Sequence, residues 1–205
     1  TRMKKSYWDT KAKSYYAQTK KSANTYDKLI ELTRNEIKDS KTLLDIGTGT
    51  GEIPIKLANS IEKIIAIDSS EEMMNVARSK VEDLKIDNID FQVMDCMNLD
   101  FKEEAFDIII SANLLHLLEN PEGFLHSIKV HLRENGKIIV PTFVHNQNLL
   151  TKTISKVAKS MGNPVVTRFD SKSLANFVEK NGFNVKKQVL LPGMMPMSFL
   201  VATKK

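Results

Sequence analysis

A short apolar strand that runs into a glycine-rich turn constrains this chain more than any other feature. Residues 43–46 form the expected strand, and Gly47, Gly49 and Gly51 follow it at alternate positions. Glycine lets bare backbone approach a ligand closely, because a side chain at the same place would block the approach. A helix is expected directly after the turn, over residues 52–59. The pattern therefore predicts a cofactor site where this strand turns into the helix.

The spacing of the glycines argues against a dinucleotide cofactor. The dinucleotide fingerprint is G-x-G-x-x-G, and its third glycine packs the helix on the strand below a pyrophosphate. This chain instead has G-x-G-x-G, preceded by Asp45. A carboxylate at that position would repel a pyrophosphate and attract an ammonium group. We therefore expect a cofactor with a cationic end in place of NAD.

Three further apolar segments follow in the order that alternating strands and helices require. They cover residues 64–68, 91–96 and 106–110, with helical segments between them. This alternation predicts an α/β domain with a doubly wound sheet. Asp68 ends the first of these strands, where an unpaired buried carboxylate would be costly, so the hydroxyl groups of a ligand are its natural partner. Capping of the next helix is the alternative role for Asp68.

The glycine turn and the three segments together resemble the class I S-adenosylmethionine-dependent methyltransferases over roughly residues 40–145. Residues 111–116, after the fourth strand, are similar to the menaquinone and ubiquinone biosynthesis branch of that family. The resemblance implies a Rossmann-like, seven-stranded and mostly parallel sheet, with only the last strand antiparallel and helices on both faces. It also implies S-adenosyl-L-methionine as the cofactor and S-adenosyl-L-homocysteine as the product.

The resemblance also assigns roles to individual residues. Asp68 would hold both ribose hydroxyls, and Asp95 would contact the adenine amino group, although Asp95 could instead cap the turn through Cys96 and Met97. Met73 would lie on the adenine face or in the core. The complete set of expected cofactor-binding residues is Asp45, Gly47, Thr48, Gly49, Gly51, Asp68, Ser69, Met73, Asp95, Cys96 and Ala112.

His116 is the candidate catalytic base. It follows the fourth strand, at the sheet edge where open α/β folds bind their ligands, and an imidazole can take a proton near neutral pH. Two leucines flank it on each side, so a packed and hydrogen-bonded histidine is the alternative. Leu117 stands where the resembling enzymes often have a second histidine. His145, after the fifth strand, is a rival candidate.

The length of 205 residues and the ordinary composition predict one domain. Within it we expect an N-terminal helical lid over residues 1–38, a cofactor-binding core over 39–143, and a substrate-cover segment with a C-terminal hairpin over 144–205. Four aromatic residues between positions 7 and 16 match the lid that folds over the cofactor in the resembling enzymes. Plain core packing is their alternative role.

Caps, turns and helical spacing predict the remaining elements. Ser69, with Glu72 three residues later, predicts a capping box for a helix that ends near Leu84. Asn135 and Gly136 predict the end of a helix that begins at Pro121 and runs to about Arg133. The other elements expected are helices at 6–19, 22–38 and 171–180 and strands at 137–143, 183–191 and 197–203.

The net charge of +5 and the pI of about 9.1 raise the question of an anionic partner. Lysine supplies nearly all of the excess, whereas arginine is the residue suited to bidentate phosphate recognition. We therefore do not expect nucleic acid as a partner. A lysine cluster between positions 4 and 28 leaves an anionic substrate or surface as the alternative.

Localisation and metal content follow from composition as well. No apolar run approaches the roughly 20 residues of a membrane span, and the N-terminus carries charges where a signal peptide would be apolar, which predicts a cytoplasmic protein. The single cysteine, Cys96, excludes an internal disulfide and a cysteine-rich metal site, so no metal is expected.

The sequence leaves the methyl acceptor and the oligomeric state open. Our first hypothesis is a small-molecule or lipid-like acceptor, such as a quinone precursor or a phospholipid amine, covered by residues 1–30 and 144–168. A tRNA or protein acceptor is the alternative, but the chain lacks an Asn/Asp-Pro-Pro-aromatic motif and a cysteine nucleophile after the fourth strand. A third possibility is a cofactor-binding protein that transfers no methyl group.

Overall fold

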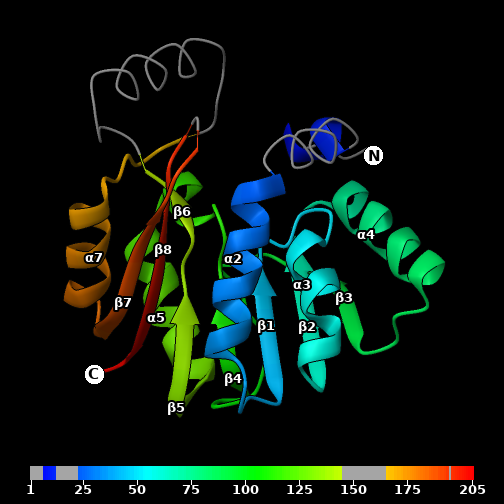
Figure 1. Ribbon diagram of the computed structural model, residues 1–205, viewed down its shortest axis with the longest axis horizontal. Helices are drawn as coiled ribbons and strands as arrows, with labels where there is room; N and C mark the ends of the chain where they lie inside the picture. Colours follow the sequence, from blue (N-terminus) through cyan, green and yellow to red (C-terminus); the bar gives the residue numbers. More distant parts are fainter. Residues whose placement is uncertain (1–6, 13–22, 145–164, 194) are drawn as a thin grey trace. The chain divides into compact units, whose positions relative to one another are not determined.

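The computed structural model describes residues 7–12, 23–144, 165–193 and 195–205 (Figure 1). The chain divides into two compact units, Thr1–Asp100 and Phe101–Lys205. The single domain with a lid, a core and a cover segment stays a prediction. Of the expected N-terminal helix, residues 7–12 are helical, and most of the expected cover segment lies outside the described residues.

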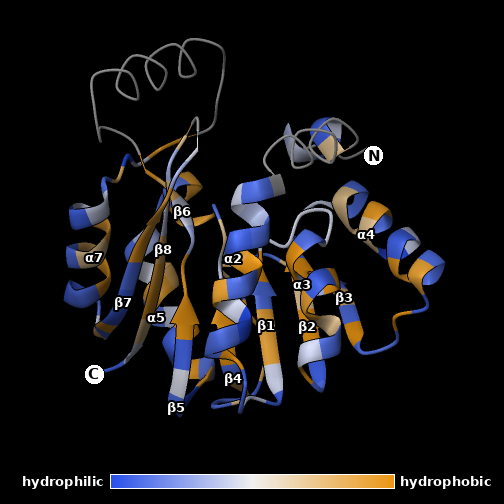
Figure 2. Ribbon diagram, viewed as in Figure 1, coloured by the Kyte–Doolittle hydropathy of each residue, from blue (hydrophilic) through white to orange (hydrophobic). Residues whose placement is uncertain are grey.

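The first unit contains three parallel strands in the order β3-β2-β1 and the helices that connect them. Leu43 and Leu44 of β1 and Ile64 and Ile67 of β2 are fully buried. Such uninterrupted apolar strands are typical of parallel sheets with both faces covered, and Figure 2 shows this apolar character along β1 and β2. The elements of this unit are α2 (Ala23–Glu36), β1 (Thr42–Ile46), α3 (Glu52–Leu57), η1 (Ala58–Ser60), β2 (Lys63–Asp68), α4 (Glu71–Leu84) and β3 (Ile89–Val93).

The start of α4 differs from the prediction by one residue. Ser70, not Ser69, is the N-cap, and its Oγ accepts a hydrogen bond from the Met73 N–H at 3.2 Å. The physical reason lies in Asp68, whose Oδ1 accepts from the Ser70 N–H at 2.9 Å and keeps the chain in a turn for one more residue. The predicted capping box at Ser69 and Glu72 was therefore wrong, whereas the predicted end of the helix at Leu84 is confirmed.

The second unit contains the strands β4-β5-β8-β6 in that order, with β7 also paired to β8. β4 and β5 are parallel, and β8 is antiparallel to β5, β6 and β7. The prediction that only the last strand is reversed is confirmed for this unit. The elements are β4 (Phe106–Ile110), η2 (Leu115–Leu117), α5 (Pro121–His131), β5 (Leu132–Ile139), β6 (Thr142–Phe143), α7 (Ser171–Lys180), β7 (Phe183–Leu191) and β8 (Met197–Lys204).

Two predicted boundaries in the second unit were wrong. The helix α5 ends at His131, and Gly136 lies inside β5, where the pairing with β4 shifts register between Phe106 and Ile108. A Cβ on Gly136 would lie 2.7 Å from Leu132 Cδ1, so glycine is required by packing at this irregularity. The strand expected over 137–143 is also divided into β5 and β6, because Pro141 between them has no N–H for a strand ladder.

Candidate cofactor site

The glycine turn between β1 and α3 has a left-handed backbone. Gly47, Gly49 and Gly51 have φ angles of 71°, 57° and 77°, which L side chains rarely adopt. The turn is tied to the end of β2, because the N–H groups of Gly47 and Thr48 both donate to the Ile67 carbonyl, at 2.9 and 3.0 Å. Backbone conformation therefore explains why the sequence places glycine at these three positions.

Gly51 has a second reason to be glycine, which the sequence analysis missed. A Cβ at this position would lie 3.1 Å from both the Ala77 Cβ and the Phe91 Cζ. The third glycine thus permits close packing against α4 and β3. Packing inside the protein explains why residue 51 is glycine, whereas close approach of a ligand to Gly47 and Gly49 stays a prediction.

Asp45 and Thr48 carry buried polar atoms that lack a partner. Asp45 is 1% exposed, and within the described part of the chain its Oδ2 and the Thr48 Oγ1 have no hydrogen-bond partner. Burial raises the pKa of Asp45 to about 7; the Thr48 hydroxyl lies near enough to lower this pKa in part, although outside hydrogen-bond geometry, and the charge of Asp68 raises it further. Buried polar atoms without partners call for a ligand. A carboxylate and a hydroxyl in this position fit the ammonium end of S-adenosylmethionine.

Asp68, at the end of β2, holds the turn and the start of α4 together. Its Oδ2 accepts from the Gly49 N–H and its Oδ1 from the Ser70 N–H, both at 2.9 Å. Burial raises the pKa of Asp68, and the backbone N–H groups around it oppose that rise. A carboxylate has about four lone-pair sites, and the main-chain N–H groups of Ser70, Gly49 and Ser69 use up to three of them. The carboxylate therefore keeps acceptor capacity for a ribose hydroxyl. It does not fill the helix-capping role that we considered as its alternative, because Ser70 is the N-cap of α4.

Asp95 and Cys96 lie in the turn after β3, because that strand ends at Val93 and not at residue 96. Asp95 is exposed, and its Oδ1 accepts from the Met97 N–H at 2.9 Å, as expected of a turn cap. Burial, and then the charge of Asp95, raise the pKa of Cys96 to about 12. The thiol is therefore neutral at physiological pH and is not poised as a nucleophile.

Met73 and Ser69 differ in exposure. Met73 is 2% exposed and belongs to a hydrophobic cluster against which Trp8 of the N-terminal helical segment packs. Ser69 is exposed. Core packing thus describes Met73 in this structure, and its contact with adenine stays a prediction. The other buried members of the cluster are Ala12, Ala66, Met74, Ala77 and Phe91.

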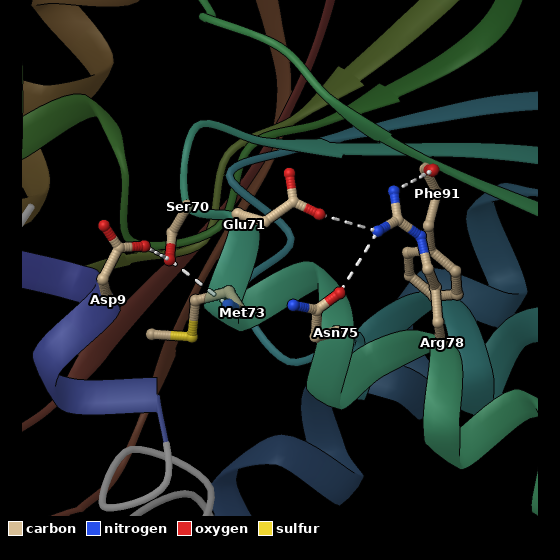
Figure 3. Close-up of polar contacts among 7 residues, drawn as sticks. All are labelled: Asp9, Ser70, Glu71, Met73, Asn75, Arg78 and Phe91. Carbon is tan, nitrogen blue, oxygen red and sulfur yellow. Dashed lines mark hydrogen bonds and ion pairs between the residues drawn. The ribbon is translucent and has the colours of Figure 1, made fainter. Parts of the chain in front are cut away.

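Two basic residues of α4 support the site, and the sequence analysis did not find them. Lys80 Nζ donates to the Thr50 carbonyl at 2.8 Å and pairs with Glu52, which clamps the glycine turn. Arg78 Nη2 donates to the Phe91 carbonyl at 3.1 Å, and its guanidinium also reaches Glu71 (Figure 3). From helical spacing alone, Lys80 and Arg78 would be predicted to lie on the solvent-exposed face of α4. The Thr50 and Phe91 carbonyls that they bind lie outside α4, so no local signal identifies these contacts.

The segment after β4 lies along the β5–β6 connection in the second unit. Asn113 has a φ of 54°, its N–H donates to the Pro141 carbonyl at 2.7 Å, and its Oδ1 accepts from the Phe143 N–H at 3.0 Å. The Ser111 and Thr142 hydroxyls are buried and have no hydrogen-bond partner among the residues that the structure describes. Ala112, between Ser111 and Asn113, is half-buried.

His116 lies in η2 and is 6% exposed. Its carbonyl accepts from the N–H groups of Val166 and Thr167, at 2.9 and 3.1 Å. These two bonds hold the segment that leads into α7 against η2. The histidine is therefore well packed, and its role as a base stays a prediction. The rival candidate His145 lies outside the described residues.

Neither a metal centre nor a membrane span is found in the part of the chain that the structure describes. There, no group of three or more His, Cys, Asp or Glu side chains could hold a metal ion. Over the same residues, no helix is both long and apolar enough to cross a membrane.

Comparison with known proteins identifies the family. The profile of the family described as "Methyltransferase domain" matches residues 37–182. The chain belongs to this family. The prediction of a class I S-adenosylmethionine-dependent methyltransferase with a Rossmann-like α/β fold is thereby confirmed, and S-adenosylmethionine is the cofactor that this family implies.

Two relatives illustrate the range of this family. The chain is similar to a demethylmenaquinone methyltransferase of Porphyromonas gingivalis, with 31% identity over 103 residues, 48% of this chain and 42% of that protein. It is also similar to a phosphatidylethanolamine N-methyltransferase of Cereibacter sphaeroides, with 29% identity over 99 residues and 48% of either chain. The matches span about half the length of these relatives.

A solved structure gives a match over nearly the whole chain. It is that of a SAM-dependent methyltransferase, possible histamine N-methyltransferase, of Thermotoga maritima. The TM-score is 0.76 with 19% identity, and the match covers 97% of this chain and 98% of that protein. At this identity the likeness concerns the fold.

Proposed function

We propose that the protein transfers the sulfonium methyl group of S-adenosylmethionine to a small-molecule or lipid-like acceptor. The observation that carries the cofactor assignment is the buried Asp45 carboxylate, whose Oδ2 has no partner within the described residues and which lies two residues before Gly47, the first glycine of the turn. The two curated relatives named above, a demethylmenaquinone and a phosphatidylethanolamine methyltransferase, support an apolar or lipid-like acceptor.

Each cofactor-binding residue has a proposed part in holding S-adenosylmethionine. Asp45 binds the ammonium group, Asp68 accepts the ribose hydroxyls, and Asp95 contacts the adenine amino group. Met73 forms part of the adenine surface. The remaining residues, which form the backbone and side-chain cradle, are Gly47, Thr48, Gly49, Gly51, Ser69, Cys96 and Ala112.

Methyl transfer requires few reactive groups from the protein itself. When bound, S-adenosylmethionine supplies an activated methyl group for in-line displacement by the acceptor. The protein aligns donor and acceptor and excludes water, and alignment alone can be worth about 7–11 kcal/mol of the barrier. An acceptor that must lose a proton also needs a base, and we assign this role to His116.

The first experiment is calorimetric titration with S-adenosylmethionine, S-adenosylhomocysteine and NAD. We expect the first two to bind and NAD not to bind. Asp68→Ala should weaken S-adenosylmethionine binding by about 1.5–3 kcal/mol, because the ribose hydroxyls lose a charged acceptor. Unchanged affinity in this variant, or tight NAD binding by the parent, would contradict the assignment.

The second experiment identifies the acceptor with methyl-labelled S-adenosylmethionine. Demethylmenaquinone and phosphatidylethanolamine vesicles test the proposed acceptor class, whereas tRNA and total protein test the alternative. Label in tRNA or protein alone would replace the first proposal by the second. Cofactor binding without label in any acceptor of a broad metabolite panel would favour a binding protein that transfers no methyl group.

A further inference from the structure

The carboxylate of Asp9 is a polar group that the proposed methyl transfer does not use. Asp9 belongs to the helical residues 7–12, and Ser70 Oγ donates to its Oδ1 at 2.6 Å. Figure 3 shows Asp9 facing Ser70 at the start of α4. A hydroxyl donor and a charged acceptor make this a short, charge-assisted hydrogen bond. The bond joins residues that are 61 positions apart in the sequence.

Ser70 connects this bond to the candidate ribose carboxylate. Ser70 is fully buried, and its N–H donates to Asp68 Oδ1 at 2.9 Å. Its Oγ accepts from the Met73 N–H at 3.2 Å. A hydroxyl has one proton, and because that proton goes to Asp9, a lone pair is left facing the Met73 N–H. Asp9 therefore holds the Ser70 hydroxyl, and the main-chain N–H of the same residue holds one oxygen of Asp68.

Apolar contacts fix the same helical segment in place. Ala12 is 4% exposed and Trp8 is partly buried, and both pack in the hydrophobic cluster that contains Met73. The segment thus packs on this cluster through Ala12 and Trp8, and the hydrogen bond of Asp9 to Ser70 joins it to the start of α4.

The charge of Asp9 also acts on Asp68. Burial is the main cause that raises the pKa of Asp68, and the negative charge of Asp9 adds to it, against the N–H groups that lower it. The other titratable groups coupled to Asp68 are Asp45 of β1 and Cys96 after β3. The carboxylates of Asp9 and Asp68 both bind Ser70, and two negative charges this close together repel each other. A role in orienting Ser70 accounts for a charged residue at this place.

We propose that Asp9 is a positioning residue of the ribose subsite: acting through the Ser70 hydroxyl, it holds the Asp68 carboxylate in the geometry that accepts the two ribose hydroxyls. The inference rests on the proposed binding of S-adenosylmethionine and extends it to a residue far from the glycine turn in sequence. Asp9 touches neither the reacting atoms nor the acceptor in this assignment.

Calorimetry on the full chain with S-adenosylhomocysteine, adenosine and 2′,3′-dideoxyadenosine tests the proposal. Asp9→Ala should weaken the binding of S-adenosylhomocysteine and adenosine by about 5- to 20-fold, which is less than the loss of a charged hydrogen bond made directly to the ligand, because Asp9 acts through Ser70. Dideoxyadenosine lacks both hydroxyls, so its weaker binding should not change. Asp9→Asn keeps an acceptor oxygen for Ser70 and should keep most of the affinity.

Two further measurements separate positioning from general stability. Because Asp9 acts through Ser70, the double variant Asp9→Ala/Ser70→Ala should bind S-adenosylhomocysteine no more weakly than Ser70→Ala alone. In Asp9→Asn, loss of the charge lowers the pKa of Asp68, so the pH at which binding is lost on acidification should fall. Glu62→Gln, which changes an exposed acid paired with Lys41, is the matched control and should alter neither quantity.

The possible outcomes are distinguishable. If the parent binds S-adenosylhomocysteine but Asp9→Ala binds it equally well, or loses adenosine and dideoxyadenosine to the same extent, the positioning role is overturned and the proposed function stands. If the parent binds neither S-adenosylhomocysteine nor adenosine, the proposed function fails and this inference fails with it. Circular dichroism of each variant shows whether it is folded, and Asp9→Asn provides a test if Asp9→Ala is not.

Discussion

At the residue scale, Asp45 makes the clearest link between burial and function. Its pKa of about 7 lies far above the ordinary value of 3.8 because the carboxylate is buried. Below pH 7 the group is largely neutral and attracts an ammonium group weakly, whereas above pH 7 it is charged. We therefore expect the affinity for S-adenosylmethionine to rise as pH increases through about 7. Calorimetry between pH 6 and 8 measures this, and an affinity that falls over the same range would contradict it.

The same carboxylate predicts a pH dependence of stability. Between about pH 4 and 7 the folded state binds a proton at Asp45 that the unfolded state has released, so the free energy of unfolding falls as pH rises. Above pH 7 Asp45 is charged in both states, and the buried charge destabilises the folded state by its full amount. Asp45→Asn should therefore raise the free energy of unfolding at pH 8, by at most about 4 kcal/mol.

Urea denaturation at pH 5 and pH 8 measures this effect in the absence of cofactor. The increase in the free energy of unfolding that Asp45→Asn causes should be much smaller at pH 5 than at pH 8. Asp83→Asn, a substitution on the exposed face of α4, is the control and should show no such difference. Equal stability of the parent and Asp45→Asn at pH 8 would show that the buried carboxylate is stabilised in some other way.

His116 is a second prediction at the residue scale. If it removes a proton from the acceptor, His116→Ala should lower turnover by about 10²–10⁴ while the affinity for S-adenosylhomocysteine stays nearly constant. His131, a buried histidine whose Nδ1 lies 3.1 Å from the Lys102 carbonyl, is the matched packing control. A loss of melting temperature with normal turnover per folded molecule would identify His116 as a packing residue.

At the scale of elements, the glycine turn depends on its neighbours in α4 and β3 as well as on its own conformation. Gly51 and Gly182 share a left-handed backbone, with φ of 77° and 89°. A Cβ on Gly182 would meet only the flexible Lys129 side chain, whereas one on Gly51 would meet Ala77 and Phe91 at 3.1 Å. Gly51→Ala should therefore destabilise the protein by about 1–3 kcal/mol more than Gly182→Ala. Chemical denaturation compares the two, and equal losses would mean that conformation alone requires glycine at Gly51.

The second element-scale observation is that caps and bulges depend on contacts outside the element. Ser69 and Ser70 are equally suitable N-caps in sequence, and Asp68 decides between them by binding the Ser70 N–H. In the same way, Asn135 and Gly136, where a turn was expected, lie inside β5, because β5 pairs with β4 both before them at Leu132 and after them from Lys137. Local rules place the helices and strands correctly here, but neighbours set their ends.

At the scale of the whole molecule, cofactor binding should order residues 1–30 of the predicted N-terminal lid. Most of that segment lies outside the described residues, whereas residues 7–12 contact α4 through Asp9, Trp8 and Ala12. We expect amide hydrogen exchange of residues 7–12 to slow when S-adenosylhomocysteine is added, because ligand binding at Asp68 favours the attached state. The helix α7 of the second unit serves as an internal reference, and identical exchange with and without ligand would contradict the lid.

The sequence alone determined the features that depend on near neighbours in the chain. The glycine turn, the acids at strand ends and the alternation of helices with strands are local patterns. They predicted an α/β domain and a cofactor with a cationic end, and their order carried the family resemblance that implied the Rossmann-like fold and S-adenosylmethionine. The tertiary structure alone decided what holds these parts in place. Gly51 is packed by α4 and β3, Lys80 clamps the turn, and Asp9 reaches Ser70 across 61 positions. Such contacts join residues far apart in the chain, and their side chains meet only after folding, so no spacing rule along the sequence can contain them.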